Sequence, residues 1–174
     1  MSRVLVFVEG QTEETFVRDL LVPYFAPLGI YLTPILAQAS PGHKGGIVSY
    51  GKVKHQVTRL CRQDHGAYVT TLIDYYGLPT DFPDSDNQAQ DAHQRVLQIE
   101  QALQQDIDEP NFIPNLLLHE FEALLFSAPA KFAEWLDDGE PIVELEAIRA
   151  AFGSPEHINN SPQTAPSKRI LTLV

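Results

Sequence analysis

The chain opens with a buried strand that runs almost directly into a helix. Arg3 to Val8 reads RVLVFV, a near-continuous β-branched and aromatic run of the kind found in parallel strands buried on both faces. Glu9 and Gly10 end this run, and apolar residues at helical spacing follow Thr12, the predicted N-cap. A strand, a tight turn and a helix in so short a segment favour an α/β fold.

Strand-like and helix-like segments then alternate along the chain. Further strands are predicted at 30–37, 67–73 and 112–118, with Pro34 indicating an edge or bulged position for the first of them. Longer helices are predicted at about 49–63 and 87–108, and short ones just after 119 and near 129–136 and 142–152. This alternation predicts a mostly parallel central sheet flanked by helices. Because the 174 residues contain no repeat and no evident linker, we predict one domain over 1–174.

Composition excludes several classes of protein. A single cysteine, Cys61, excludes a disulfide framework and a multi-cysteine zinc site. No apolar stretch approaches the ~20 residues of a membrane span, and the first residues do not resemble a signal peptide. We therefore expect a cytoplasmic protein without a membrane partner. The sequence does not predict an oligomeric state.

Charge is unevenly distributed. Twelve basic and 23 acidic residues give a net charge of −11, which argues against general attraction to nucleic acid. No acidic residue lies between Asp19 and Asp64, an interval that carries five basic ones: Lys44, Lys52, Lys54, Arg59 and Arg62. This segment is either a surface for DNA or RNA phosphates or a basic helix that pairs with the acidic remainder of the chain.

Acidic residues follow three of the predicted strands. Glu9 comes after the first, Asp74 after the third, and Glu120 with Glu122 after the fourth, while Glu13 lies one helical turn beyond Glu9. Carboxyl ends of parallel strands meet at one edge of a sheet, where ligands of open α/β folds bind. Clustered carboxylates favour a hard cation, so the pattern predicts one or two Mg²⁺ or Mn²⁺ ions. Taken one at a time, the glutamates Glu13, Glu120 and Glu122 are also ordinary helix-start residues.

Four motifs carry a family resemblance over essentially the whole chain: VEGQTEETF, LIDYYGLP, LHEFEALLF and SPQTAPSKRI. The sequence resembles the uncharacterised family catalogued as domain of unknown function 4276, whose members look like Toprim-fold proteins. Members usually continue past the Ser-Lys-Arg motif, and the apolar ending at Val174 agrees with a truncated C-terminus.

The resemblance implies a metal-dependent nuclease chemistry. Glu9 matches the Toprim glutamate, Glu13 a second acid that related nucleases place four positions on, and Asp74 the first Asp of Asp-x-Asp. Glu120 or Glu122 is similar to a later acid of these nucleases, and Lys168 to a late lysine that stabilises charge on phosphate. The chain departs from the pattern at Tyr76, which replaces the second Asp of Asp-x-Asp.

Two functions from different classes remain open. One is a phosphoesterase or nuclease acting on DNA or RNA, in which Glu9, Asp74 and Glu120 or Glu122 hold the metal and Glu13 is a ligand or general base. The other is a non-catalytic module that binds a protein partner in a larger assembly, for example phage-defence machinery. A weaker third option is a phosphotransferase in which the loop around Lys44 contacts a nucleotide.

Overall fold

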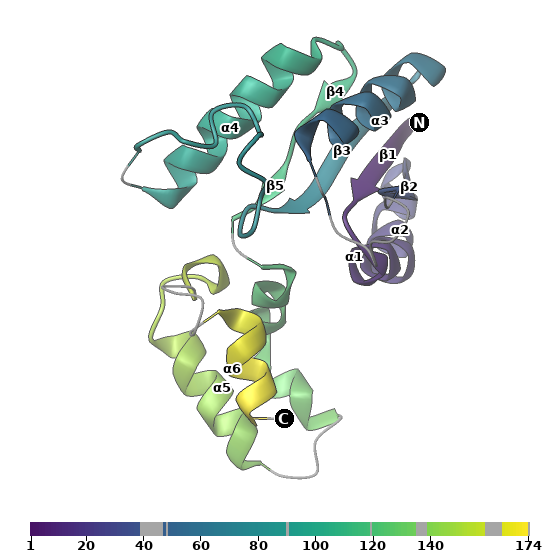
Figure 1. The fold of residues 1–174 in the computed structure, drawn as a ribbon. Helices are drawn as coiled ribbons and strands as arrows, with labels where there is room; N and C mark the ends of the chain where they lie inside the picture. The colour runs from purple at the N-terminus through teal and green to yellow at the C-terminus, as the bar shows by residue number, and fades with distance from the viewer. Residues whose placement is uncertain are drawn as a thin grey trace. The chain divides into compact units, whose positions relative to one another are not determined.

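The structure of the chain is a computed structural model that describes residues 1–38, 47, 49–89, 91–118, 120–134, 139–158 and 165–173. These residues form two compact units, Met1–Leu117 and Leu118–Val174. The first unit holds a parallel sheet with helices packed against it, and the second is made of helices (Figure 1). The predicted α/β class with a parallel sheet flanked by helices is confirmed.

The sheet of the first unit has the order β2-β1-β3-β4, with β5 also paired to β3. Its strands are β1 (Ser2–Val8), β2 (Ile30–Leu36), β3 (Ala67–Asp74), β4 (Phe112–Ile113) and β5 (Leu116–Leu117). Every pairing between them is parallel. β2 lies at an edge, as its proline predicted, because a proline cannot donate a ladder hydrogen bond. β1 and β3 are central neighbours, with Val8 opposite Leu72.

The predicted strand over 112–118 is divided in two. β4 pairs Phe112 with Val69, and β5 pairs Leu116 with Ile73, so both halves keep the same register on β3. Pro114, which lacks an N–H, and Asn115 lie between the two halves. β4 and β5 are therefore one strand with a short interruption.

One face of the sheet is covered by a single irregular helical segment between β1 and β2. It consists of α1 (Gln11–Phe16), the π-helical η1 (Val17–Leu21), α2 (Val22–Phe25) and the 3-10 helix η2 (Ala26–Leu28). Val17 packs with Val6 and Val8 in a buried cluster. The N-cap is Gly10, so the prediction of Thr12 was wrong: the helix begins directly after the strand and Thr12 lies in its first turn.

The other face is covered by α3 (Tyr50–Gln63) and α4 (Ala92–Ile107), which contact β3, β4 and each other. α3 buries Val53, Val57 and Leu60, and α4 buries a second apolar row that includes Ile99 and Leu103. α4 is shorter than predicted, because the Asp91 carboxylate accepts a hydrogen bond from the Gln94 N–H at 3.0 Å and starts the helix there.

The described residues of the second unit form five short helical segments. They are the 3-10 helices η3 (Phe121–Ser127), η4 (Pro129–Glu134) and η5 (Pro155–His157) and the α-helices α5 (Glu140–Ala150) and α6 (Pro166–Leu173). Phe126, Leu145 and Ile158 form its buried cluster. The predicted short helices are present here, although two of them are 3-10 helices.

In the part of the chain that the structure describes, none of the helices is both long and apolar enough to cross a membrane.

Candidate active site

Glu9 and Asp74 meet at the carboxyl edge of the sheet. Asp74 is the last residue of β3, and Glu9 follows the last residue of β1, its hydrogen-bonded neighbour. The Glu9 carboxylate accepts hydrogen bonds from the backbone N–H groups of Asp74 and Ile47. The sequence pattern predicted that these two acids end parallel strands at one edge of the sheet, and the structure places them together there.

Partial burial changes the acidity of Glu9. Loss of solvation raises the pKa of its carboxyl group, and the negative charge of Glu13 raises it further. The two backbone N–H groups act in the opposite direction, but the pKa stays raised. Asp74 is also half-buried, and its Oδ1 atom has no access to solvent. These acids are therefore partly removed from water, as ligands or catalytic groups often are.

Glu13 lies beside Glu9, in the first turn of α1. Its carboxylate lies close to Gly10: a Cβ atom added at Gly10 would come within 2.9 Å of Glu13 Oε2. Gly10 thus leaves space for the Glu13 side chain at the turn between strand and helix. The arrangement brings together the three predicted acids of the first unit along one edge.

The loop after Asp74 is held against the start of α3. The Asp81 carboxylate accepts a hydrogen bond from the Tyr50 N–H at 2.9 Å, and the Phe82 ring, 3% exposed, packs against the Tyr50 ring. Tyr76, which departs from the Asp-x-Asp pattern, is 41% exposed. The Asp81 carboxylate thus binds the start of α3.

α3 brings positive charge to the acidic edge. The Ile47 N–H binds Glu9, and Ile47 lines the same small hollow as Lys52. The first turns of α3 therefore lie next to the acidic edge. Arg59 and Arg62 are exposed further along the helix. Lys44 lies outside the described residues, and so does the glycine loop around it.

Two of the predicted basic residues pair with acids. Lys54 Nζ lies 2.9 Å from Asp106 Oδ2, and Arg62 Nε lies 2.6 Å from Glu109 Oε1. The interpretation of α3 as a basic helix paired with acidic residues is therefore correct for this side of the helix. Arg59 takes no part in an ion pair within the described residues.

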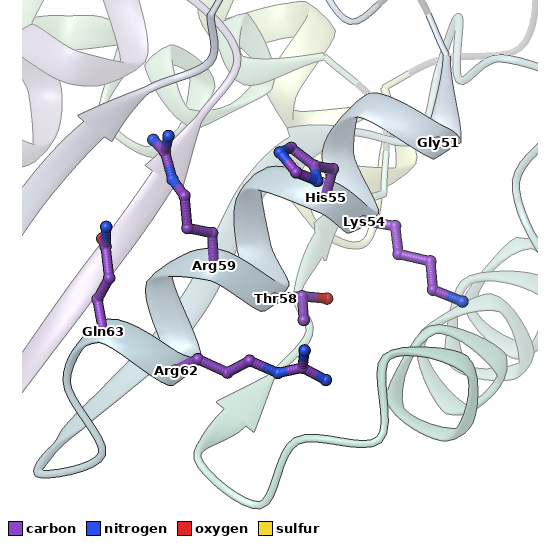
Figure 2. A pocket seen from close by; sticks show the side chains of 7 residues that line it. All are labelled: Gly51, Lys54, His55, Thr58, Arg59, Arg62 and Gln63. Carbon is purple, nitrogen blue, oxygen red and sulfur yellow. The ribbon is translucent and has the colours of Figure 1, made fainter.

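A cavity of about 670 Å³ along α3 includes four residues that sequence reasoning missed: Gly51, His55, Thr58 and Gln63 (Figure 2). They alternate with Lys54, Arg59 and Arg62 on the exposed side of the helix. The i, i+4 spacing of these residues in the segment 49–63 was the available signal, because it places them in rows on one helix surface.

The remaining predicted site residues belong to the second unit. The Glu120 carboxylate accepts a hydrogen bond from the Ser167 N–H at 3.0 Å, so it caps the start of α6. Glu122 is half-buried in the first turn of η3, and Lys168 is exposed in the first turns of α6. This bond joins the motifs LHEFEALLF and SPQTAPSKRI within the second unit. The contact between Glu9 and Asp74 joins VEGQTEETF and LIDYYGLP in the same way. Whether Glu120, Glu122 or Lys168 serves the metal chemistry stays a prediction.

The acids at the edge fit a Mg²⁺ or Mn²⁺ ion as a pair. Among the described residues, no group of three or more His, Cys, Asp or Glu side chains is placed to hold a metal ion. Mg²⁺ commonly binds through only one or two carboxylates and keeps waters and substrate phosphates as its other ligands. Glu9 and Asp74 supply such oxygen ligands, and a cation would offset the cost of their partial burial.

Fold and site define a class of protein: a parallel α/β domain with acidic residues where its central strands end. The family described as Domain of unknown function (DUF4276) matches residues 8–174. The chain belongs to this family, and the match covers both units. No curated protein and no solved structure matches the chain.

Proposed function

We propose that the chain is a phosphoesterase that depends on Mg²⁺ or Mn²⁺ and cleaves nucleic acid, as Toprim-related nucleases do, at the carboxyl edge of its sheet. The observation that carries the proposal is the contact between the Glu9 carboxylate and the backbone of Asp74 at the ends of β1 and β3. Pairs of acids that are partly buried at strand ends are typical of metal-assisted phosphoryl chemistry. A cytoplasmic location belongs to the same proposal.

Each residue at the edge has a stated role. Glu9 and Asp74 would hold the ion, which supplies polarisation of a phosphate oxygen and acidification of a bound water. Glu13, beside Glu9, would accept the proton of the attacking water. Lys52, at the start of α3, would provide positive charge next to the phosphate. Tyr76 in place of an aspartate supports the use of one ion.

The experiment compares Asp74→Asn with the wild-type chain on a supercoiled plasmid and on an RNA oligonucleotide, in Mn²⁺ and in a chelator. We expect chelator-sensitive cleavage by the wild-type chain and a loss of roughly 10²-fold or more in Asp74→Asn. The matched control is Asp86→Asn, which neutralises an exposed carboxylate in the same loop and keeps activity. Cleavage by Asp74→Asn at the wild-type rate would refute the assignment.

A non-catalytic binding module is the second candidate. Two observations favour it: Tyr76 stands where the Toprim pattern has an acid, and no group of three metal-binding side chains occurs in the described ranges. Calorimetry with Mn²⁺ separates the two candidates. A wild-type chain that binds no Mn²⁺, yet captures one defined protein with its edge residues, supports the binding module.

A further inference from the structure

Within the described ranges, the residues that line the cavity along α3 all belong to that helix, from Gly51 to Gln63. Its side chains form two rows with i, i+4 spacing, in which Lys54, Thr58 and Arg62 extend from one side of α3 and His55, Arg59 and Gln63 from another (Figure 2). All of these side chains except Thr58 and Gln63 are basic, and no acidic residue occurs in α3. The surface therefore offers hydrogen-bond donors to an anion along its whole length.

The ion pairs at the cavity leave this donor surface accessible. Arg62 contacts Glu109 through Nε, so its two Nη groups are not used by that pair. The Lys54 side chain, 43% exposed, stays in contact with solvent while it binds Asp106. The Lys54–Asp106 pair is solvent-exposed, and such pairs contribute little to stability. Glu109 is largely buried, but the Arg62 side chain that it contacts is 69% exposed. Arg59, which has no such pair in the described part, adds an uncompensated charge.

The cavity starts where the acidic edge ends. Gly51, at one end of the cavity, adjoins Lys52, which lines the hollow that includes Ile47. The Ile47 N–H binds the Glu9 carboxylate. A nucleic-acid strand with one phosphate at Glu9 and Asp74 could therefore follow the helix, and its next phosphates would reach His55, Arg59 and Arg62.

We propose that this cavity binds the nucleic-acid strand on one side of the scissile phosphate, so that the strand leaves the acidic edge and follows α3. The proposal rests on the proposed function, which it deepens by naming the path of the substrate. Residues four apart in a helix are separated by ~6 Å along its axis, a separation close to that of successive phosphates in a strand. A row of this length, roughly 18 Å from Gly51 to Gln63, suits several phosphates and is longer than a single free phosphate needs.

The first test measures salt-dependent binding of a fluorescent 12-nucleotide DNA without divalent metal, by anisotropy. The variant Arg59→Gln removes one exposed cation of the cavity, and Arg18→Gln removes an exposed arginine of η1 as the matched control. Each phosphate contact contributes about one to the slope of log K against log salt. We expect Arg59→Gln to reduce that slope by about 1 and to weaken binding roughly 5-fold, while Arg18→Gln behaves as the wild-type chain.

The second test measures kcat/KM in Mn²⁺ for a dinucleotide and for the 12-nucleotide strand. We expect the wild-type chain to prefer the longer substrate by roughly 10-fold or more, and Arg59→Gln to lose most of this preference. Unchanged slope and unchanged preference in Arg59→Gln would overturn the strand path even if cleavage is observed. A mononucleotide that binds as tightly as the 12-nucleotide strand would also overturn it, because the cavity would then hold one phosphate only. Binding with the expected slopes but no cleavage would support the path and refute the phosphoesterase.

Discussion

Glu9, a proposed metal ligand, has an environment that changes its acidity. Its carboxyl group is partly buried next to Glu13, and both features raise its pKa, burial most strongly. An acid with a raised folded-state pKa destabilises the fold once the pH is high enough to ionise it. The charge that would bind a cation is therefore maintained at a cost to the metal-free protein.

We expect Glu9→Gln to stabilise the metal-free chain at pH 8 by roughly 1–3 °C in Tm. Glutamine keeps an oxygen for the Ile47 and Asp74 N–H groups and carries no charge. The difference should vanish as the pH falls below the ordinary glutamate pKa of 4.5, because Glu9 is then protonated in both the folded and the unfolded states. Thermal melting from pH 4 to pH 8 measures it, with Glu14→Gln as the control. A destabilised Glu9→Gln at pH 8 would contradict this explanation.

At the scale of elements, a side chain joins the two halves of the interrupted strand. Thr71 Oγ1 donates a hydrogen bond to the Asn115 carbonyl at 2.7 Å and accepts one from the Asn115 N–H at 2.9 Å. The Asn115 side-chain amide in turn donates to the Thr71 carbonyl at 3.2 Å. These bonds replace the ladder bonds that Pro114 interrupts and keep β5 opposite the end of β3, where Asp74 lies.

Thr71→Val should destabilise the chain by about 2 kcal/mol, because the two hydrogen bonds between the Thr71 hydroxyl and the Asn115 backbone are lost without a change in side-chain volume. Thr71 is only 2% exposed, so water does not take the place of its hydroxyl. Urea unfolding of Thr71→Val and of Thr70→Val, which changes the neighbouring residue on the opposite face of β3, gives the comparison. We expect Thr70→Val to stay within about 0.5 kcal/mol of the wild-type value. Equal stabilities of the two variants would show that the Thr71 bonds do not hold the strand.

At the scale of the whole molecule, the chain consists of two compact units that meet in sequence after Leu117. The boundary falls inside the apolar run of residues 116–118, without the glycine, proline or polar residues that usually mark a linker. The first unit contains the five strands that the described residues form, both acids of the Glu9–Asp74 pair and the α3 cavity. The cluster of Phe126, Leu145 and Ile158 belongs entirely to the second.

We expect the fragment 1–117 to fold without the rest of the chain, since its sheet and the helices on both faces lie within it. Circular dichroism should show mixed α/β content and one cooperative thermal transition. The fragment should also bind the 12-nucleotide strand with the salt slope of the full chain, because α3 lies within it. A fragment without cooperative melting would show that the first unit depends on residues 118–174.

Much of this arrangement follows from local sequence patterns. The apolar run of β1, the basic segment of α3 and the acids after three of the strands were recognised without a structure, because periodicity and residue type act over a few residues. Two helix starts were predicted wrongly. Thr12 was predicted as the N-cap of the first helix, which is Gly10, and α4 was predicted to begin near residue 87 but begins at Ala92. In both places the start of the helix depends on how the preceding chain is held.

Sequence alone determined the α/β class, the family and the acids that end the strands, because strand order and residue type decide which groups reach the carboxyl edge. Only the tertiary structure decided which N–H groups bind Glu9, that Lys54 and Arg62 pair with Asp106 and Glu109, and that Thr71 joins the strand at Pro114. These contacts join residues some 40 to 65 positions apart. Such partners are selected by packing and register, which no short stretch of sequence specifies.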